Sequence, residues 1–316
     1  MDTGTTTSRS TRQLLAEGRT PGELRRAVAA GDLVHLRRGA YAQEAGKTPE
    51  DRHRQLIEAT VAGLSGAVLS HHSAAVVHGL LLPYGPMKEV QVIRPRASRG
   101  GGTKRGSLHV HVARLAPEDV TVVDGLAVTT RARTLVDLAC RMTFDAGVIA
   151  LDAGLHHPEG RGRESAEMRQ QVEAALSRMR RVAGIKKARD GVAFADGRAE
   201  SPLETRSRLL FWREGIATPE IQHLVLDRSG RELARLDFAW PALHVYGECD
   251  GKVKYTTLLR PGESAGDVVM REKRRDNALA DLGWHQVRWM DLDLQRPKVL
   301  AGRVRQALVS ASGFPV

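Results

Sequence analysis

The chain has 316 residues, of which 41% are hydrophobic and 27% charged, as in a folded protein with room for about two domains. Its formal net charge is +11, and this excess favours a polyanionic partner, although a generally arginine-rich composition would also produce it. Only two cysteines occur and no apolar run approaches the roughly 18–20 residues of a membrane span, which excludes a disulfide framework and predicts a reducing, cytoplasmic location without membrane contact.

The positive charge is unevenly distributed. Residues 196–316 contain 19 Lys and Arg against 17 Asp and Glu, a net charge of +2, so residues 1–195 carry 29 against 20, a net charge of +9. We therefore expect the first two-thirds of the chain to supply most of the affinity for phosphates. The acids of the last third call for another explanation.

The N-terminal pattern predicts two short helices followed by a hairpin. One helix is expected over Thr11–Glu17, and the capping box Thr20-Pro21-Gly22-Glu23 opens a second helix that ends at Gly31. Two β segments around a basic turn then cover Leu33–Tyr41. Helix, turn, helix and hairpin make up a winged helix-turn-helix, which we assign to residues 1–45.

Five residues of this region are similar to the N-terminal domain of AbiEi-type antitoxins: Gly31, Leu33, Arg38, Gly39 and Tyr41. The resemblance implies that four arginines face a nucleic acid, namely Arg25 and Arg26 on the second helix and Arg37 and Arg38 on the wing. The alternative is a solvated helix face and an ordinary turn. The first helix of a full winged helix is short or missing.

Residues 46–155 read as a mixed α/β connector that also matches the AbiEi-like proteins. A helix is expected from Pro49 to about Leu64, and strands are expected between Glu89 and Val128. The histidines of the run Ser70–Leu80 lack metal-ligand spacing and an acid, so we expect them to pack in a small helix. Residues 156–195 follow as a basic helical linker, which is either a clamp for a nucleic-acid backbone or a solvated helix end.

Two short strands with acids set into them cover Arg235–Lys252 and meet at a corner at Pro241. Side chains alternate along a strand, so Glu248 and Asp250 should share a face with Tyr246 while Cys249 points the other way. A turn at Pro241 puts Asp237 roughly diagonal to Glu248. Two carboxylates at that spacing can both touch one hard cation, which predicts a divalent metal.

Five motifs in order give the C-terminal part a second resemblance. They are Ser201-Pro202-Leu203-Glu204, Asp237-Phe238, Glu248-Cys249-Asp250-Gly251, the basic run Arg271–Asp276 and Gly283-Trp284. This order over residues 196–295 resembles the very-short-patch-repair (Vsr)-like endonucleases of the PD-(D/E)XK superfamily. The resemblance implies a restriction-endonuclease-like α/β/α domain over residues 196–312, so the fold class expected for the whole chain is α/β.

The same resemblance assigns roles to individual residues. It implies a catalytic set of Glu204, Asp237, Glu248, Asp250 and Lys252. It implies Mg²⁺ as the cofactor, or Mn²⁺ in its place, with Asp237, Glu248 and Asp250 as the metal ligands. It also implies DNA contacts from Lys254, Lys273, Arg274 and Arg275. One departure matters, because Asp250 stands where the superfamily has a lysine. The nearest lysines are Lys252 and Lys254.

Two functions follow. The first is a DNA-binding, Mg²⁺-dependent endonuclease that nicks double-stranded DNA in mobile-element defence or in repair. The alternative is an antitoxin-like regulator that binds DNA through an inactive nuclease fold. The sequence leaves open the target site, a toxin or repair partner, and whether the protein forms a homodimer.

Overall fold

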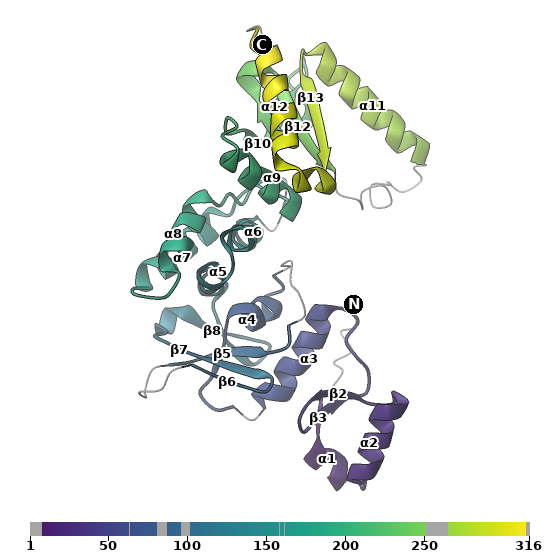
Figure 1. The fold of residues 1–316 in the computed structure, drawn as a ribbon, viewed down its shortest axis with the longest axis vertical. Helices are drawn as coiled ribbons and strands as arrows, with labels where there is room; N and C mark the ends of the chain where they lie inside the picture. Colours follow the sequence, from purple (N-terminus) through teal and green to yellow (C-terminus); the bar gives the residue numbers. More distant parts are fainter. Residues whose placement is uncertain are drawn as a thin grey trace. The chain divides into compact units, whose positions relative to one another are not determined.

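The computed structural model describes residues 8–62, 64–80, 87–95, 102–157, 159–160, 162–250 and 265–313. These residues form two compact units. Unit 1 contains residues 1–150 and 170–193, and unit 2 contains residues 151–169 and 194–316. Helices and strands are mixed in both units, which confirms the α/β class (Figure 1). The finer division into four segments stays a prediction.

The N-terminal part of unit 1 has the expected order of elements. Helices α1 (Thr11–Ala16) and α2 (Pro21–Ala30) precede the hairpin of β2 (Val34–Arg37) and β3 (Ala40–Ala42), with β1 (Arg9–Ser10) beside β3. Both helices begin at a capping box, and α2 ends because Gly31 takes the left-handed conformation, with φ of 85°. Leucines at 14, 24 and 33 form the small core of this part.

A six-stranded mixed sheet forms the rest of the unit 1 core, in the order β6-β7-β5-β4-β9-β8. Its strands are β4 (Val68–Leu69), β5 (Val90–Pro95), β6 (Thr103–Arg105), β7 (Leu108–Ala113), β8 (Val120–Val123) and β9 (Leu126–Thr129). Apolar side chains of α3 (Pro49–Val61) and α4 (His71–Val77) pack against this sheet. The histidine run therefore lies in a packed helix, as expected.

Further helical segments complete unit 1 and lead into unit 2. A 3₁₀ turn (Pro117–Asp119) precedes β8, and α5 (Arg131–Arg141) follows β9. Helices α6 (Phe144–Leu155) and α7 (Ala166–Arg178) each have residues in both units, and α8 (Ile185–Phe194) follows α7. Gly184, which begins the approach to α8, must be a glycine because an added Cβ would meet the carbonyl oxygen of Cys140 at 2.1 Å.

Unit 2 is built on a four-stranded sheet in the order β10-β11-β12-β13. The strands are β10 (Glu220–Leu226), β11 (Glu232–Trp240), β12 (Val245–Asp250) and β13 (His285–Met290). The first three are antiparallel, and β13 runs parallel to β12 because α11 (Ala265–Asp281) forms the crossover between them. A 3₁₀ turn (Pro241–Leu243) makes the corner expected at Pro241.

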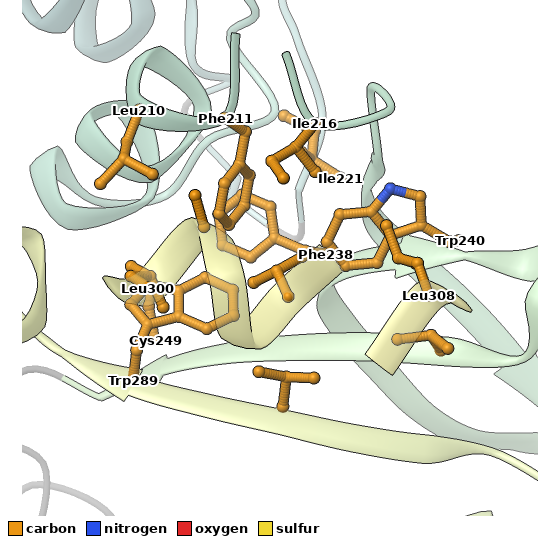
Figure 2. Close-up of a cluster of buried hydrophobic side chains, with 14 of the residues drawn as sticks. Leu210, Phe211, Ile216, Ile221, Phe238, Trp240, Cys249, Trp289, Leu300 and Leu308 are labelled. Carbon is orange, nitrogen blue, oxygen red and sulfur yellow. The ribbon is translucent and has the colours of Figure 1, made fainter. Parts of the chain in front are cut away.

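Helices cover both faces of this sheet. On one face, α9 (Pro202–Arg213) and α12 (Pro297–Ala311, after a 3₁₀ turn at Asp291–Gln295) pack against Phe238 and Trp289 (Figure 2). On the other face, Leu279 of α11 packs against Tyr246. Gly247 lets the Trp289 ring lie against the strand, because a Cβ there would meet the ring at 2.4 Å. The observed layers are helix, sheet and helix.

Candidate metal and nucleic-acid site

Strands β11 and β12 separate at the two acids that the sequence singles out. Their pairing covers three residue pairs and ends at Phe238 and Gly247. Beyond that point β11 continues to pair with β10, and β12 continues to pair with β13 as far as Asp250. Asp237 and Glu248 are therefore the first residues past the last pair. We call these two residues and the strand ends that carry them the β11–β12 fork.

The register corrects one detail of the sequence analysis. Phe238 lies opposite Gly247, so continuing the same register by one residue puts Asp237 opposite Glu248. The expected diagonal relation differs from this register by two residues. Directly opposite positions are closer than diagonal ones, with Cβ atoms about 4.5–5.5 Å apart in a regular pair.

Asp237 is half-buried and is held against the other arm of the fork. Its Oδ2 accepts a hydrogen bond from the backbone N–H of Cys249 at 3.2 Å, and the Cys249 Sγ lies 3.8 Å from the same oxygen. Cys249 itself packs in the core with Trp289. The Asp237 carboxylate is thus fixed beside the backbone that follows Glu248.

Glu248 lies on the opposite face from Cys249, as the alternation predicts. It is 7% exposed and pairs with the guanidinium groups of Arg275 on α11 and of Arg288 on β13, the latter at 3.0 Å. Gln286 donates a further hydrogen bond to Glu248 Oε2 at 3.0 Å. The parallel register, which places Glu248 beside Arg288, brings these groups to one face.

The cations around Glu248 are stabilised by its charge. Burial of Arg275 disfavours its charged form, but the carboxylates of Glu248 and Asp276 outweigh burial and raise the pKa of Arg275. Arg288 also reaches Asp250, with Nε 3.5 Å from Oδ2. Asp250 therefore belongs to the same charge cluster as Glu248, in agreement with the expected shared face.

Glu204 has partners of its own. It is 5% exposed near the start of α9, where Ser201 Oγ donates to Oε1 at 2.8 Å and Gln222 Nε2 donates to Oε2 at 2.8 Å. Gln222 lies on β10, two strands away from β12 in the sheet. The pairs on either side of it, Ile221 with Phe238 and His223 with Leu236, put Gln222 opposite Asp237, so Glu204 is anchored beside the strand that carries Asp237. The structure brings Glu248 and Asp250 into one charge cluster, holds Asp237 on Cys249, and anchors Glu204 to Gln222 of β10.

The donor set at the fork fits a hard cation only in part. Within the described ranges no group of three or more His, Cys, Asp and Glu side chains is arranged to hold a metal. Mg²⁺, however, is usually held by one or two carboxylates together with water and substrate phosphate, rather than by a protein cage. Asp237 and Glu248 supply two such carboxylates. To bind the metal, Glu248 would have to release its ion pair with Arg275 or Arg288.

The basic residues expected to contact DNA divide into exposed and anchored groups. Those exposed are Arg25 and Arg26 on α2, Arg38 after β2, and Lys273 and Arg274 on α11. Arg37 is anchored instead, because its Nε donates to the carbonyl of Ala59 on α3 at 2.9 Å. Arg275 points inward to Glu248. Lys252 and Lys254 lie outside the described residues.

Unit 2 also contains a buried ion pair that the sequence pattern did not predict. Asp152 is 1% exposed and accepts from Arg208 Nη1 at 2.7 Å, from Thr205 Oγ1 at 2.9 Å and from the Asp196 N–H at 2.8 Å. Burial raises the pKa of Asp152 to about 7, although the nearby charge of Arg208 lowers it. The partners of Asp152 lie 44 to 56 residues from it in the sequence, so no local pattern could predict this cluster.

Two curated proteins and one solved structure are similar to this chain. No family model matches the chain. Two curated proteins of Mycobacterium tuberculosis are similar to it, uncharacterized protein MT2308 of strain CDC 1551 and uncharacterized protein Rv2248 of strain H37Rv. Each is 33% identical over 187 residues, which are 59% of this chain and 63% of the relative, so the matched region spans less than two-thirds of the relatives' length.

One solved structure is similar in part. The crystal structure of the Rv2827c protein from Mycobacterium tuberculosis covers 70% of this chain and 84% of its own, with 17% sequence identity and a TM-score of 0.37. Separately, no helix in the described part of the chain is long and apolar enough to cross a membrane.

Proposed function

We propose that the protein is a DNA-binding, metal-dependent endonuclease and that the β11–β12 fork of unit 2 is its cleavage site. The observation that carries this proposal is the separation of two paired strands at Asp237 and Glu248. Two carboxylates at the mouth of a fork can both reach one cation and leave its outer side open to a phosphate. Such a site needs no further protein ligand.

Asp237 and Glu248 would hold Mg²⁺ or Mn²⁺, with Asp250 beside them. The bound metal would polarise the scissile phosphate and lower the pKa of an attacking water. The Cys249 N–H fixes the orientation of Asp237. Arg275 and Arg288, which contact Glu248, are placed to balance the negative charge of a phosphate at the fork.

Exposed cations on both units support DNA as the substrate class. Lys273 and Arg274 lie on α11, the helix whose Arg275 contacts the fork, and they can bind backbone phosphates on either side of it. Unit 1 adds Arg25, Arg26 and Arg38 on its surface. Contacts of this kind position a duplex without reading its sequence.

A second candidate function is DNA binding without cleavage, as in a transcriptional regulator. Both oxygens of Glu248 already have cationic or amide partners, so its negative charge is neutralised within the fold. Asp250 also occupies the position of the superfamily lysine. In this alternative the acids stabilise unit 2, and the basic surfaces do the binding.

Supercoiled plasmid separates the two candidates. The full chain is incubated with plasmid in Mg²⁺, in Mn²⁺ and in EDTA, together with Asp237→Asn and Glu248→Gln. Glu232→Gln is the matched control, because Glu232 is an exposed acid on the same strand as Asp237. We expect nicking that needs metal, that both fork variants lose and that the control keeps. Retardation of the plasmid with no cleavage in either metal would establish the second candidate instead.

A further inference from the structure

We propose that unit 1 contains a binding site for a free nucleotide, in a cavity bounded by β7, by the C-terminal end of α5 and by residues 178–183. The cavity has a volume of about 1,400 Å³, and all of its lining residues belong to unit 1. Pockets for small ligands commonly measure about 300–1,000 Å³, so a nucleotide fits and a DNA duplex does not. This site is independent of the proposed cleavage site.

Arginines outnumber acids on the cavity wall. Two aspartates line it together with six arginines, at positions 114, 133, 141, 178, 180 and 181. Asp119 accepts from Arg133 at 2.9 Å and from Arg178 Nε at 3.1 Å, and Arg133 also pairs with Asp137 at 3.0 Å. The two acids are therefore satisfied by two of the arginines.

The remaining four arginines form no close ion pair with an acid among the residues that the structure describes, although the charge of Arg141 also acts on Asp137. Arg114, Arg180 and Arg181 are exposed at the cavity, and the Arg141 guanidinium contacts only the imidazole of His111 there. Converging like charges repel one another, and they raise the local concentration of anions. Guanidinium groups bind phosphate through paired, charge-assisted hydrogen bonds, so a ligand with several phosphates suits this wall best.

Three stacked histidines form another part of the wall. The rings of His71 and His111 lie 4.1 Å apart between centroids, and those of His109 and His111 lie 3.9 Å apart. The rings are tilted by 31° and 37°, and no group of three or more His, Cys, Asp and Glu among the described residues could hold a metal ion, so these ring faces suit an aromatic ligand better. His109 is the most exposed of the three and is the one available to stack on a base.

The histidines stay neutral beside these arginines. His111 Nδ1 accepts from Arg141 at 3.3 Å, and its Nε2 lies 3.3 Å from Gln91 Oε1, to which it can donate. Burial, with His109 and Arg141 nearby, lowers the pKa of His111 to about 4. A neutral imidazole adds no charge to the wall, and the arginines alone attract the anion.

A buried acceptor completes the recognition elements. Asp137 lines the cavity and is 4% exposed, and its Oδ2 is buried without a hydrogen-bond partner among the described residues. A hydroxyl or amino group of the ligand would satisfy this oxygen. Phosphates for the arginines, a flat ring for His109 and a hydroxyl or amino donor for Asp137 occur together in a nucleotide.

Calorimetric titration of the full chain in EDTA tests this site, because EDTA removes metal-dependent cleavage from the measurement. ATP is the probe, and inorganic phosphate, pyrophosphate, a short single-stranded oligonucleotide and a duplex are titrated in parallel. We expect saturable binding of ATP at one site per chain, weaker binding of pyrophosphate and the weakest binding of phosphate. Equal affinity for ATP and pyrophosphate would overturn the assignment of a base site. Binding of the oligonucleotides without ATP binding would overturn the proposal as a whole.

Two single variants locate the site. Arg141→Ala and Arg180→Ala should each weaken ATP binding about tenfold or more, since each removes a charge-assisted contact. Arg189→Ala is the matched control, because Arg189 is an exposed arginine on α8 that does not line the cavity. Circular dichroism establishes that each variant is folded. ATP binding that both cavity variants retain at full strength, or that the control loses equally, contradicts the proposal.

The resonances of His111 give a second readout, which distinguishes contact in the cavity from binding elsewhere. The phosphates of ATP bound near Arg141 should stabilise the protonated form of His111 and so raise its pKa from about 4. An unchanged titration of His111 in saturating ATP contradicts binding at this wall.

Discussion

The β11–β12 fork and the unit 1 cavity differ in the sign of the charges that they gather: acids at the fork and mostly arginines at the cavity. At the fork, two acids follow the last pair of β11 and β12, and arginines from α11 and β13 neutralise Glu248. At the cavity, arginines from three separate segments converge, and four of the six form no close ion pair with an acid among the described residues. Glu248 is neutralised within the fold, whereas the arginines of the cavity need an anion from outside.

The largest effect on stability should come from the buried acid that serves the cavity wall. Asp119 is 1% exposed and bonds both Arg133 and Arg178. Asp119→Ala leaves the buried Arg133 with one acid fewer, so we expect unit 1 to lose about 3–5 kcal/mol in its free energy of unfolding. Urea denaturation followed by circular dichroism measures this loss. A change below about 1 kcal/mol would show that the network contributes little.

A smaller loss is expected at the fork. In Glu248→Gln, Arg288 keeps Asp250 and Arg275 keeps Asp276, so their charges are still compensated. We expect a loss of about 1–3 kcal/mol, the cost of replacing charged hydrogen bonds by neutral ones. The same denaturation experiment applies. If this variant unfolds as severely as Asp119→Ala, the acids of the fork are structural and the comparison between the two regions fails.

The histidines make the stability of unit 1 depend on pH. The pKa of His111 is lowered to about 4 in the folded protein from about 6.5, so the unfolded chain binds the proton first as the pH falls. The stability contributed by His111 is present above pH 6.5 and is lost as the pH falls from about 6.5 to about 4. Asp137, whose pKa is raised to about 6, works in the opposite direction over part of this range.

His111→Gln isolates the histidine contribution, because glutamine keeps a donor for Gln91 and cannot titrate. We expect the fall in stability between about pH 6.5 and pH 4 to be shallower in this variant than in the wild type. Thermal unfolding at half-unit steps of pH measures the difference. Parallel curves for the two proteins would contradict the lowered pKa.

The smallest effect concerns the exposed arginines of α2. Arg25→Ala combined with Arg26→Ala should weaken binding to all DNA sequences alike and reduce the slope of log affinity against log salt by about 1 to 2. Arg37→Ala is the contrasting variant, since Arg37 is bonded to Ala59 and should affect stability more than the salt slope. Fluorescence anisotropy at several salt concentrations distinguishes the two outcomes.

Local patterns in the sequence predicted much of the fold. The capping box at Thr20 and the left-handed Gly31 set the ends of α2, which neighbouring residues alone determine. The alternation along β12 gave the faces of Glu248 and Cys249 correctly. The expected register between β11 and β12 was off by two residues, because it depends on a 3₁₀ turn whose length Pro241 alone does not fix.

Features that depend on distant residues could not be predicted. Asp119 bonds Arg133 and Arg178, which are 14 and 59 residues away, and no spacing rule links them. The anchoring of Glu204 by Gln222 likewise depends on how α9 lies against β10. The sequence analysis put Glu204 among the catalytic acids because its motif matched, and a motif carries no information about which neighbour a carboxylate will bond.

The central claim is that the acids of the β11–β12 fork hold a metal that cuts DNA. The most direct test is the rate at which supercoiled plasmid becomes open circles in Mg²⁺, measured for the wild type and for folded Asp237→Asn. We predict metal-dependent nicking by the wild type and none above background by the variant. Equal rates for the two proteins, or no nicking by the wild type in Mg²⁺ or Mn²⁺, would contradict the claim.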